Sequence, residues 1–564
     1  MNLLTIIVCC VLGYAVVALP SKEGGKTTSQ SDLELTIVHF NDFHARFDEQ
    51  NPTSGVCKPG NVCHGGIARM YESIMNIMDS DTNPILLNAG DNFQGTLWYS
   101  LFKWNVTQYF MNMLPIKAYT IGNHEFDDKV DGLIPFLKAI KAPALVCNLN
   151  DTLVPEIQGL YKKSLVFEVE GKKIAIVGVA LTSTPEISNT GDLGFFDEVA
   201  SVNAEVDRLV REEDIFTAIV LSHAGYFIDM KIAKESTEKI SLIVGGHSHT
   251  FLNNGTGEDG TKPEGTYPTV IKRDLDGQMV PVVQAACYTR YLGRLKLVIG
   301  ANGEAVSWDG QPIFMAPSLP KNAKIVELMK PWQEAVEAAG SKLLGSTDVH
   351  LEAETCRFEE CNFGNFLTDA MVFAYKERAR GDSWAYASLA IMNSGGIRAS
   401  IPVGNITYND LITSQPFANT FDVGTLQGTH IKAFLEQTAL PTRFRDIQAN
   451  VQLLQLSGFK VVYDLSQPEY HRVVDLQLLC ADCPKPVYEP FDPLKDYKII
   501  VPSFVVAGGD GYNVIRDNLK DLVIGPLDMD VLAEYLSKVS PVTTGLEGRI
   551  SFVGKTRPKR EALY

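Results

Sequence analysis

Asp42 and His44 stand two residues apart at the end of the segment Val38-His39-Phe40-Asn41-Asp42-Phe43-His44, which begins with an apolar run. Carboxylates and imidazoles are ligands for divalent cations. In an extended strand, residues two apart point to the same side. The spacing therefore predicts that both side chains face one cation at the end of a strand. An Asp-x-His pair by itself is common by chance, so this interpretation needs further support.

Four more polar clusters each follow an apolar, strand-like run. They are Gly90-Asp91-Asn92, Gly122-Asn123-His124-Glu125, Ser222-His223 and Gly245-Gly246-His247-Ser248-His249. A single His after a strand is usually a hydrogen-bonded loop residue. Here, however, six of the ten His residues of the chain fall in the five clusters. Five strand ends that deliver Asp, Asn and His are typical of a hydrolytic site with two metal ions.

The carboxylate at the centre of the set is Asp91, which is therefore the best candidate to bridge two cations. Asp42 and His44 would complete the ligands of one metal, and Asn123, His223 and His247 those of the other. His249, two residues beyond His247, is a further candidate ligand. Mixed Asp, Asn and His ligation suits Zn, Mn, Fe or Co better than Ca, although a dependence on Ca or Mg stays open.

His124 follows the expected ligand Asn123 directly, so it can reach the site without binding a metal. Such a His can stabilise a transferring phosphoryl group or protonate the leaving group. Asp127, three residues further on, could orient its ring. The alternative is that His124 is itself a ligand.

The second half of the chain carries residue types suited to recognition. Arg357 and Arg398 can make charge-assisted hydrogen bonds to phosphate, and Phe417 and Phe504 could sandwich a flat base. Asp510 could accept ribose hydroxyls. Each residue also has an ordinary explanation, as a solvated Arg or Asp or as a core Phe. The residues alone therefore only suggest a nucleoside site.

The length of 564 residues is too great for one core and indicates two or three domains. Apolar runs alternate with helical patterns, which predicts an α/β domain over residues 33–315 that holds all five polar clusters. A helix punctuated by Pro, over residues 320–340, is the expected connector. A second α/β domain, without a metal cluster, would then cover residues 341–553.

The formal net charge of −17 disfavours binding to nucleic acid backbones or anionic membranes. Residues 1–18 are apolar and end in small residues, which predicts a secretory signal peptide. A non-cleaved anchor is the alternative, but the segment is short for a membrane span. The C-terminus is basic and lacks the hydrophobic tail of a lipid-anchor signal. We therefore expect a secreted protein without a membrane anchor.

Cysteine spacing agrees with an oxidising compartment. The close pairs Cys57/Cys63, Cys356/Cys361 and Cys480/Cys483 predict small disulfide loops. Cys147 and Cys287 are left as buried thiols or as a long-range pair. Four N-glycosylation sequons begin at Asn105, Asn150, Asn254 and Asn405.

Taken together, the clusters resemble those of the 5′-nucleotidase family of calcineurin-like metallophosphatases. The segments Asn393-Ser394-Gly395-Gly396-Ile397-Arg398 and Gly508-Gly509-Asp510-Gly511 resemble that family's nucleotide-binding domain. The resemblance implies one metal held by Asp42, His44, Asp91 and His249, and a second held by Asp91, Asn123, His223 and His247. It makes His124 and Asp127 the catalytic pair. It assigns Phe417 and Phe504 to base stacking, and Arg357, Asn393, Arg398 and Asp510 to phosphate and ribose.

Within the family, Phe43 to Phe47 and Asn92 to Tyr99 look like the secreted salivary apyrases of blood-feeding arthropods. That likeness implies hydrolysis of ATP and ADP, which would prevent platelet aggregation at a bite. Some insect apyrases that resemble this chain have lost the Arg of the Asn-x-Gly-Gly-Ile-Arg segment, whereas Arg398 is retained here. Hydrolysis of AMP to adenosine, the reaction of a 5′-nucleotidase, therefore stays open.

One segment belongs to a different class of function. Arg380-Gly381-Asp382-Ser383 is an RGDS tetrapeptide between a helical stretch and a strand-like one. If it forms an exposed loop, it could bind a platelet integrin and make the protein an antagonist of fibrinogen binding. The ordinary explanation is a charged turn that ends a helix.

Overall fold

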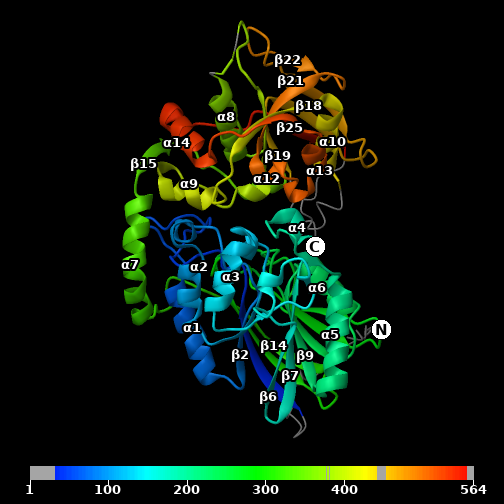
Figure 1. Cartoon of the computed structure of the whole chain (residues 1–564). Coiled ribbons are helices and arrows are strands. Elements are labelled where there is room, and N and C mark those ends of the chain that lie inside the picture. The colour runs from blue at the N-terminus through cyan, green and yellow to red at the C-terminus, as the bar shows by residue number, and fades with distance from the viewer. Residues whose placement is uncertain (1–31, 377, 380, 441–452, 555–564) are drawn as a thin grey trace, which may run out of the picture.

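The computed structural model describes residues 32–376, 378–379, 381–440 and 453–554. Figure 1 shows two α/β domains stacked end to end, with helix α7 running along one side between them. The α/β prediction is therefore confirmed. The expected signal peptide and Arg380 of the RGDS segment lie outside the described residues.

The first domain contains two six-stranded sheets. One has the order β14-β13-β1-β2-β3-β4, in which β1 to β4 run parallel, β13 pairs antiparallel with β1, and β14 pairs antiparallel with β13. Its strands are β1 (Leu33–Phe40), β2 (Pro84–Asn88), β3 (Ile116–Thr120), β4 (Ala144–Leu145), β13 (Tyr291–Ile299) and β14 (Ala305–Phe314).

The other sheet has the order β11-β12-β10-β9-β7-β6, with β7, β9, β10 and β12 parallel. Its strands are β6 (Ser164–Val169), β7 (Lys172–Ala180), β9 (Thr217–His223), β10 (Ile240–Val244), β11 (Thr269–Lys272) and β12 (Met279–Val283). The two sheets pack together through one apolar cluster, in which Leu35 and Ile37 of β1 meet Ile176 and Val220 of the other sheet.

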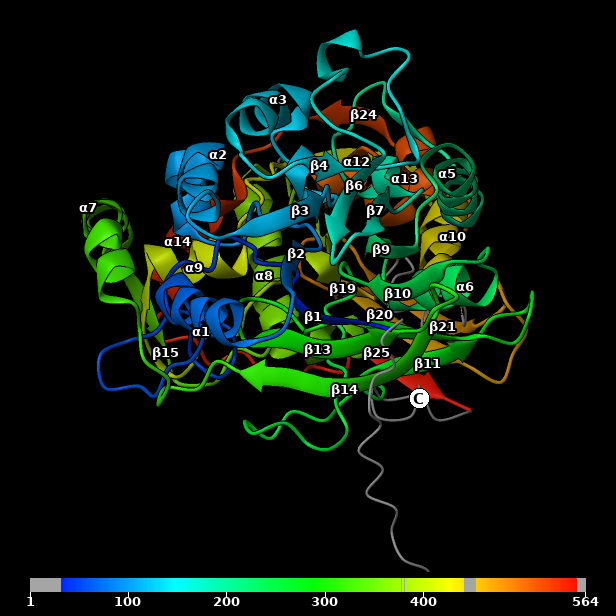
Figure 2. The same ribbon diagram turned by 90° about the horizontal axis from the view of Figure 1, so that it is seen from below.

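Helices cover the outer faces of this pair of sheets (Figure 2). Helices α1 (Ile67–Ser80), α2 (Leu97–Met111) and α3 (Lys129–Ala139) lie over the first sheet, and α5 (Glu198–Glu213) and α6 (Tyr226–Lys234) over the second. The strands β1, β9 and β10 are almost wholly buried. Sheets covered on both faces have this continuous apolar character.

Helix α7 (Ala323–Gly340) lies within the segment expected to connect the domains and contacts α1 and α2. It leads into β15 (Leu343–Thr347), which pairs with β17 (Gly404–Thr407), and into helix α8 (Asn362–Lys376). Helices α9 (Tyr408–Ser414) and α14 (Asp528–Val539) also belong to this side of the second domain. A continuous apolar cluster joins residues of α1 and α2, through α7, to α8 and α14.

The second domain is built on a five-stranded sheet in the order β19-β16-β23-β18-β24 and a four-stranded sheet in the order β22-β21-β20-β25. The strands of the first are β16 (Leu389–Asn393), β18 (Phe421–Gln427), β19 (Leu454–Ser457), β23 (Asp496–Pro502) and β24 (Lys520–Val523). Those of the second are β20 (Phe459–Asp464), β21 (Val473–Leu479), β22 (Tyr488–Pro490) and β25 (Ile550–Val553). Helices α10 (Gly428–Thr438) and α13 (Asn513–Asn518) pack against this core.

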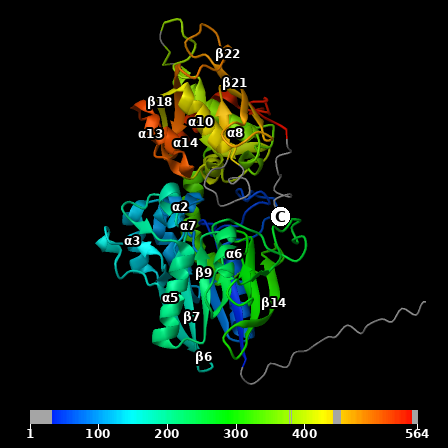
Figure 3. The same ribbon diagram turned by 90° about the vertical axis from the view of Figure 1, so that its right-hand side faces the viewer.

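The domains meet across a narrow zone that Figure 3 shows edge-on. Helix α9 contacts α2, and the short α4 (Thr184–Ile187) contacts the 3-10 turn η5 (Gly509–Gly511) of the second domain. The three predicted disulfides are present, and Cys147 and Cys287 are free thiols. Within the described ranges, no helix is long and apolar enough to span a bilayer.

Candidate active site

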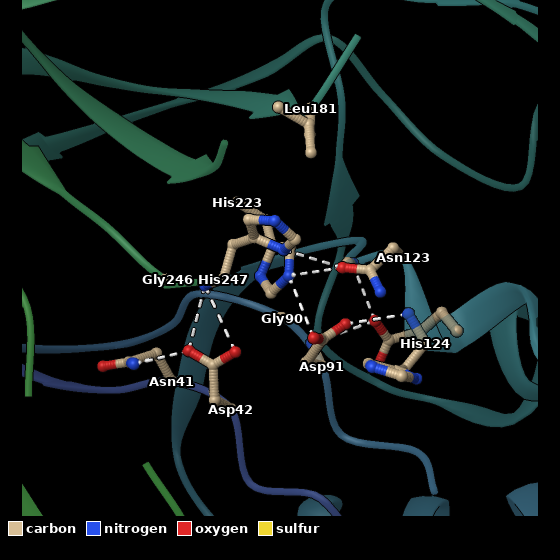
Figure 4. A network of polar contacts seen from close by, with 12 residues as sticks. Asn41, Asp42, Gly90, Asp91, Asn123, His124, Leu181, His223, Gly246 and His247 are labelled. Carbon is tan, nitrogen blue, oxygen red and sulfur yellow. Dashed lines mark hydrogen bonds and ion pairs between the residues drawn. The ribbon is translucent and has the colours of Figure 1, made fainter. Parts of the chain in front are cut away.

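Five loops meet where the parallel strands of the two sheets end (Figure 4). The strands β1, β2 and β3 of one sheet and β9 and β10 of the other each lead into one of the polar clusters. Because the carboxyl ends of parallel strands lie at one edge of a sheet, side chains far apart in sequence converge there. Clefts at this edge are the usual ligand sites of α/β proteins.

The structure corrects the geometry expected for Asp42 and His44. Strand β1 ends at Phe40, and both residues adopt a left-handed backbone with φ of 50° and 48° instead of an extended one. The loop is fixed because Asp42 N and His44 N donate to the carbonyls of Gly90 and Asp91, at 3.0 Å each. Both side chains still reach the same place, through a tight turn and not through strand alternation.

The Asp91 carboxylate lies at the centre of the cluster. Its Oδ2 is 3.1 Å from His223 Nε2 and 3.6 Å from His44 Nε2. On the far side of His44, His249 Nε2 lies 3.2 Å from His44 Nε2 and 3.3 Å from Asp42 Oδ1. Asp42, His44 and His249 thus form one possible ligand group for a metal.

A second group gathers around Asn123 on the other side of Asp91 (Figure 4). Asn123 Oδ1 is 2.8 Å from His247 Nδ1 and 3.3 Å from His223 Nε2. The ring of His223 is oriented by the Ala89 carbonyl, 2.6 Å from its Nδ1. Asp91, His223 and His247 have ligand atoms close enough together to hold one ion. The donor chemistry of both groups, carboxylate with imidazole and amide oxygen, fits divalent transition metals.

Glycines let these loops come so close. A Cβ on Gly122 would collide with the Asp91 carboxylate, and one on Gly90 would lie 2.8 Å from His223 Nδ1. Gly90 also has a φ of 85°, which favours glycine over other residues. Gly90 and Gly122, which begin two of the polar clusters, therefore each have a steric reason.

Sequence reasoning missed Glu125, although it lies inside one of the motifs. Its buried carboxylate accepts hydrogen bonds from the backbone N–H groups of Asp91 at 3.0 Å, Asn92 at 2.6 Å and Gly122 at 2.7 Å. It therefore ties the loop that carries Asp91 to the loop that carries Asn123. A Glu directly after Asn123-His124, inside the motif, is the signal that could have revealed it.

The protonation states of most of these groups suit metal ligation, and His223 is the exception. Burial acts to lower the pKa of His223, but the Asp91 and Asp42 carboxylates outweigh burial and raise that pKa to about 10, so this ring would have to lose a proton to bind a metal. Burial would raise the pKa of Asp91, but the His223 and His124 imidazoles beside it hold that pKa well below its usual range. Burial lowers the pKa of His247 to about 3 and keeps that of His44 well below 6.5. These two rings are therefore neutral, as a metal ligand must be.

His124 and Asp127 form a hydrogen-bonded pair, with 2.7 Å between Nδ1 and Oδ2. Ser188 donates to the other Asp127 oxygen at 3.1 Å, which fixes the carboxylate. Burial acts to lower the pKa of His124, but Asp127 and Asp91 outweigh it and raise that pKa. A protonated imidazole held in this way can donate a proton or stabilise developing charge. His124 also lies near His44 and Asp91, so its geometry permits ligation as well.

The residues predicted in the second domain line the same cavity as the metal groups. It has a volume of about 680 Å³ and lies between the domains. Asp91, Asn123, His124, Asp127, His247 and His249 contribute from the first domain, and Arg357, Asn393, Arg398, Phe417, Phe504 and Asp510 from the second. Asp42, His44 and His223 are buried behind its wall.

Two of these second-domain residues reach across to the metal groups. Arg398 Nη2 is 3.4 Å from His44 Nε2. The ring of Phe417 stacks on the His124 imidazole, with centroids 5.6 Å apart and planes 19° apart, and the Arg398 guanidinium lies 5.8 Å from the Phe417 centroid. Phe417 is therefore packed on the catalytic candidate as well as facing the cavity.

The far wall holds Phe504 and Asp510. Asn393 donates to Asp510 Oδ2 at 2.9 Å. A Cβ on Gly509 would lie 2.5 Å from the Phe504 ring, so only glycine allows that ring its position. Asn419, which was not predicted, accepts from the backbone N–H of Phe504 at 3.1 Å and thereby links the Phe417 and Phe504 loops.

Three residues of the RGDS segment, Gly381, Asp382 and Ser383, lie within the described part of the chain. Gly381 and Asp382 are exposed and Ser383 is half-buried. None of these three residues lines the cavity described above. Integrin binding stays a prediction.

This fold and its donor set define a metal-dependent phosphoesterase with a separate substrate domain. Comparison with protein families agrees. Residues 35–251 match the calcineurin-like phosphoesterase model, and residues 343–517 match the model of the 5′-nucleotidase C-terminal domain.

Similar proteins extend the comparison over nearly the whole chain. An apyrase of Tabanus yao is 44% identical over 95% of this chain and 97% of its own. Human 5′-nucleotidase is 38% identical over 92% of this chain and 91% of its own. The crystal structure of a 5′-nucleotidase precursor from Thermus thermophilus superposes with a TM-score of 0.84, at 32% identity, covering 93% of this chain and all of that one. The chain belongs to the 5′-nucleotidase family, and it is a metal-dependent nucleotide phosphohydrolase.

Proposed function

We propose that the protein is a secreted apyrase, which hydrolyses extracellular ATP and ADP with two divalent metal ions. The observation that carries this proposal is the single cavity shared by the metal groups, the His124–Asp127 pair and the aromatic and arginine residues of the second domain. A terminal phosphate at the metal groups and a base near Phe417 and Phe504 would both fit within it.

The ligand assignment follows the two donor groups. Asp42, His44, Asp91 and His249 would hold one ion, and Asp91, Asn123, His223 and His247 the other. A pair of such ions supplies a water-derived nucleophile and neutralises phosphoryl charge. The ions are proposed to be of the Zn, Mn or Co type.

The chain's own residues would do the remaining work. Arg357 and Arg398 would bind phosphate oxygens, and Asn393 and Asp510 would bind the ribose. Phe417 and Phe504 would stack on the base. His124, oriented by Asp127, would stabilise the transferring phosphoryl group or protonate the departing oxygen.

Preference for ATP and ADP over AMP is supported by the greater identity to the Tabanus yao apyrase than to human 5′-nucleotidase. Arg398 next to His44 supports the alternative, because it places a cation where a phosphate attached directly to a nucleoside could bind. AMP hydrolysis is therefore the second candidate activity.

Secretion is supported by the signal-like residues 1–18 and by the disulfides, which form in oxidising compartments. Removal of ADP outside cells would inhibit platelet aggregation. Phosphate release from ATP, ADP, AMP and a simple aryl phosphate ester tests the proposal in one experiment. Faster release from ADP and ATP than from AMP is expected. AMP as the preferred substrate would favour the 5′-nucleotidase, and activity on the ester alone would contradict both.

A further inference from the structure

Tyr288 lies against the first metal group, and no sequence pattern pointed to it. Its buried ring meets the His44 ring edge-on, with centroids 5.4 Å apart and an interplanar angle of 69°. It meets the His249 ring in the same way, at 5.2 Å and 75°. The two imidazoles also contact one another at 5.1 Å. The three rings therefore form one edge-to-face cluster.

The backbone of Tyr288 reaches the third member of that group. Its N–H donates to the Asp42 carbonyl at 2.8 Å. One residue thus contacts Asp42 through its main chain and both His44 and His249 through its side chain. A shift of Tyr288 would displace all three at once.

The loop that carries Tyr288 is held in an unfavourable conformation. Ala286, Tyr288 and Thr289 have φ of 54°, 60° and 59°, a region that residues other than glycine adopt at a cost. Hydrogen bonds hold it there: Gln50 Nε2 donates to the Tyr288 carbonyl, and Thr289 Oγ1 accepts from Gly66 N at 2.8 Å. Backbone strain that the surroundings maintain is concentrated at functional sites.

Arg46 lies over the Tyr288 ring. The guanidinium carbon lies 4.5 Å from the ring centroid, and the side chain is buried. A cation over an aromatic face is attracted by the ring quadrupole, and more strongly when both are desolvated. The attraction to Arg46 therefore stabilises the position of the Tyr288 ring against the imidazoles.

The second metal group is oriented by other means. His223 is fixed by a hydrogen bond to the Ala89 carbonyl, and the Asp91 and Asn123 loops are tied together by Glu125. Groups that orient metal ligands raise affinity, and their loss typically weakens metal binding by about 10- to 100-fold. In the first group, the Asp42 carboxylate accepts hydrogen bonds from Asn41 Nδ2 at 2.6 Å and from His247 N at 3.0 Å, whereas the His44 and His249 rings pack against the Tyr288 ring.

We propose that Tyr288 is a positioning residue for the metal ion of the Asp42–His44–His249 group. Its ring sets the direction of both imidazoles, and its backbone sets Asp42. The inference rests on the metal site of the proposed function, but not on which nucleotide is the substrate.

The test is metal binding to the full-length protein, measured by Zn²⁺ titration and by elemental analysis after dialysis. Tyr288→Leu should weaken the binding of one of the two ions by about 10- to 100-fold and leave the binding of the other unchanged. Tyr288→Phe keeps the ring and should bind both ions as the wild type does. Tyr375→Leu, which removes a buried tyrosine of the second domain, controls for general loss of stability.

Arg46→Met gives a second measurement, independent of the folding of Tyr288→Leu. It keeps the ring but removes the cation that holds it, so the same ion should bind several-fold more weakly. Unchanged binding of both ions in Tyr288→Leu, or in Arg46→Met if the first variant does not fold, would overturn the inference. Equal weakening by Tyr375→Leu would also overturn it. A wild-type protein that binds no metal would overturn the proposed site and this inference together.

Discussion

The two walls of the interdomain cavity are built differently. The metal wall is backed by almost fully buried side chains, such as His223 at 0% and Asp91 at 1%, on loops that end parallel strands. His247 and His249, which face the cavity, are half-buried. The opposite wall consists of partly exposed side chains, among them Arg357, Phe417 and Phe504, on short helical turns and loops. In the proposed function, the chemistry belongs to the more buried wall and substrate recognition to the more exposed one.

That difference explains what substitutions should do on each side. A buried ligand has no substitute when it is removed, because the rest of the donor set is fixed by backbone hydrogen bonds such as those of Glu125. A stacking residue contributes a graded amount of binding. Substitutions in the metal wall should therefore abolish activity, whereas those in the recognition wall should change substrate preference.

The largest effect is expected for Asp91→Ala. Both donor groups depend on this carboxylate, so phosphate release should fall by at least about 1,000-fold on every substrate. Circular dichroism should show that the protein remains folded. Asp79→Ala, at an exposed acid on α1, is the matched control and should behave as the wild type. Retention of more than about a tenth of wild-type turnover would remove Asp91 from the bridging role.

His124→Ala should lower turnover by about 100- to 1,000-fold, the range typical of lost transition-state stabilisation. Both metals should remain bound, because the proposed ligands are intact. Asp127→Asn should produce a smaller loss, since it disturbs only the orientation and proton affinity of His124. Loss of one metal ion from His124→Ala, measured by elemental analysis, would instead make His124 a ligand.

Substitutions of the two phenylalanines should have different effects. Stacking on a base is worth about 1–3 kcal/mol, so Phe504→Ala should raise KM for ADP by roughly 5- to 150-fold and spare an aryl phosphate ester. Phe417 also stacks on His124, so Phe417→Ala should raise KM for ADP and lower kcat on both substrates. Equal losses on both substrates for Phe504→Ala would mean that Phe504 supports the fold and not the base.

The contrast between the walls also explains which site residues the sequence could predict. Asp91 and Asn123 were found because short motifs follow apolar strands, and parallel topology brings strand ends together. Residue types alone only suggest that Phe417 and Phe504 stack on a base, and Asn393 carries no pattern, so the assignment of all three depends on the family resemblance. Tyr288 and Asn419 could not be found, because their contacts depend on loops far apart in sequence. The extended geometry expected for Asp42 and His44 was wrong, because hydrogen bonds to Gly90 and Asp91 impose a turn.

The smallest effect on catalysis is expected outside both walls, at the RGDS segment. Asp382→Glu changes an exposed residue that does not line the cavity, so phosphate release should equal that of the wild type. If platelet inhibition depends on ADP removal, Asp91→Ala should abolish it and Asp382→Glu should not. If an integrin is bound, the pattern reverses: Asp91→Ala still blocks fibrinogen binding to platelets and Asp382→Glu does not. We expect the first pattern, because two domains converge on the hydrolytic cavity whereas the alternative depends on four consecutive residues.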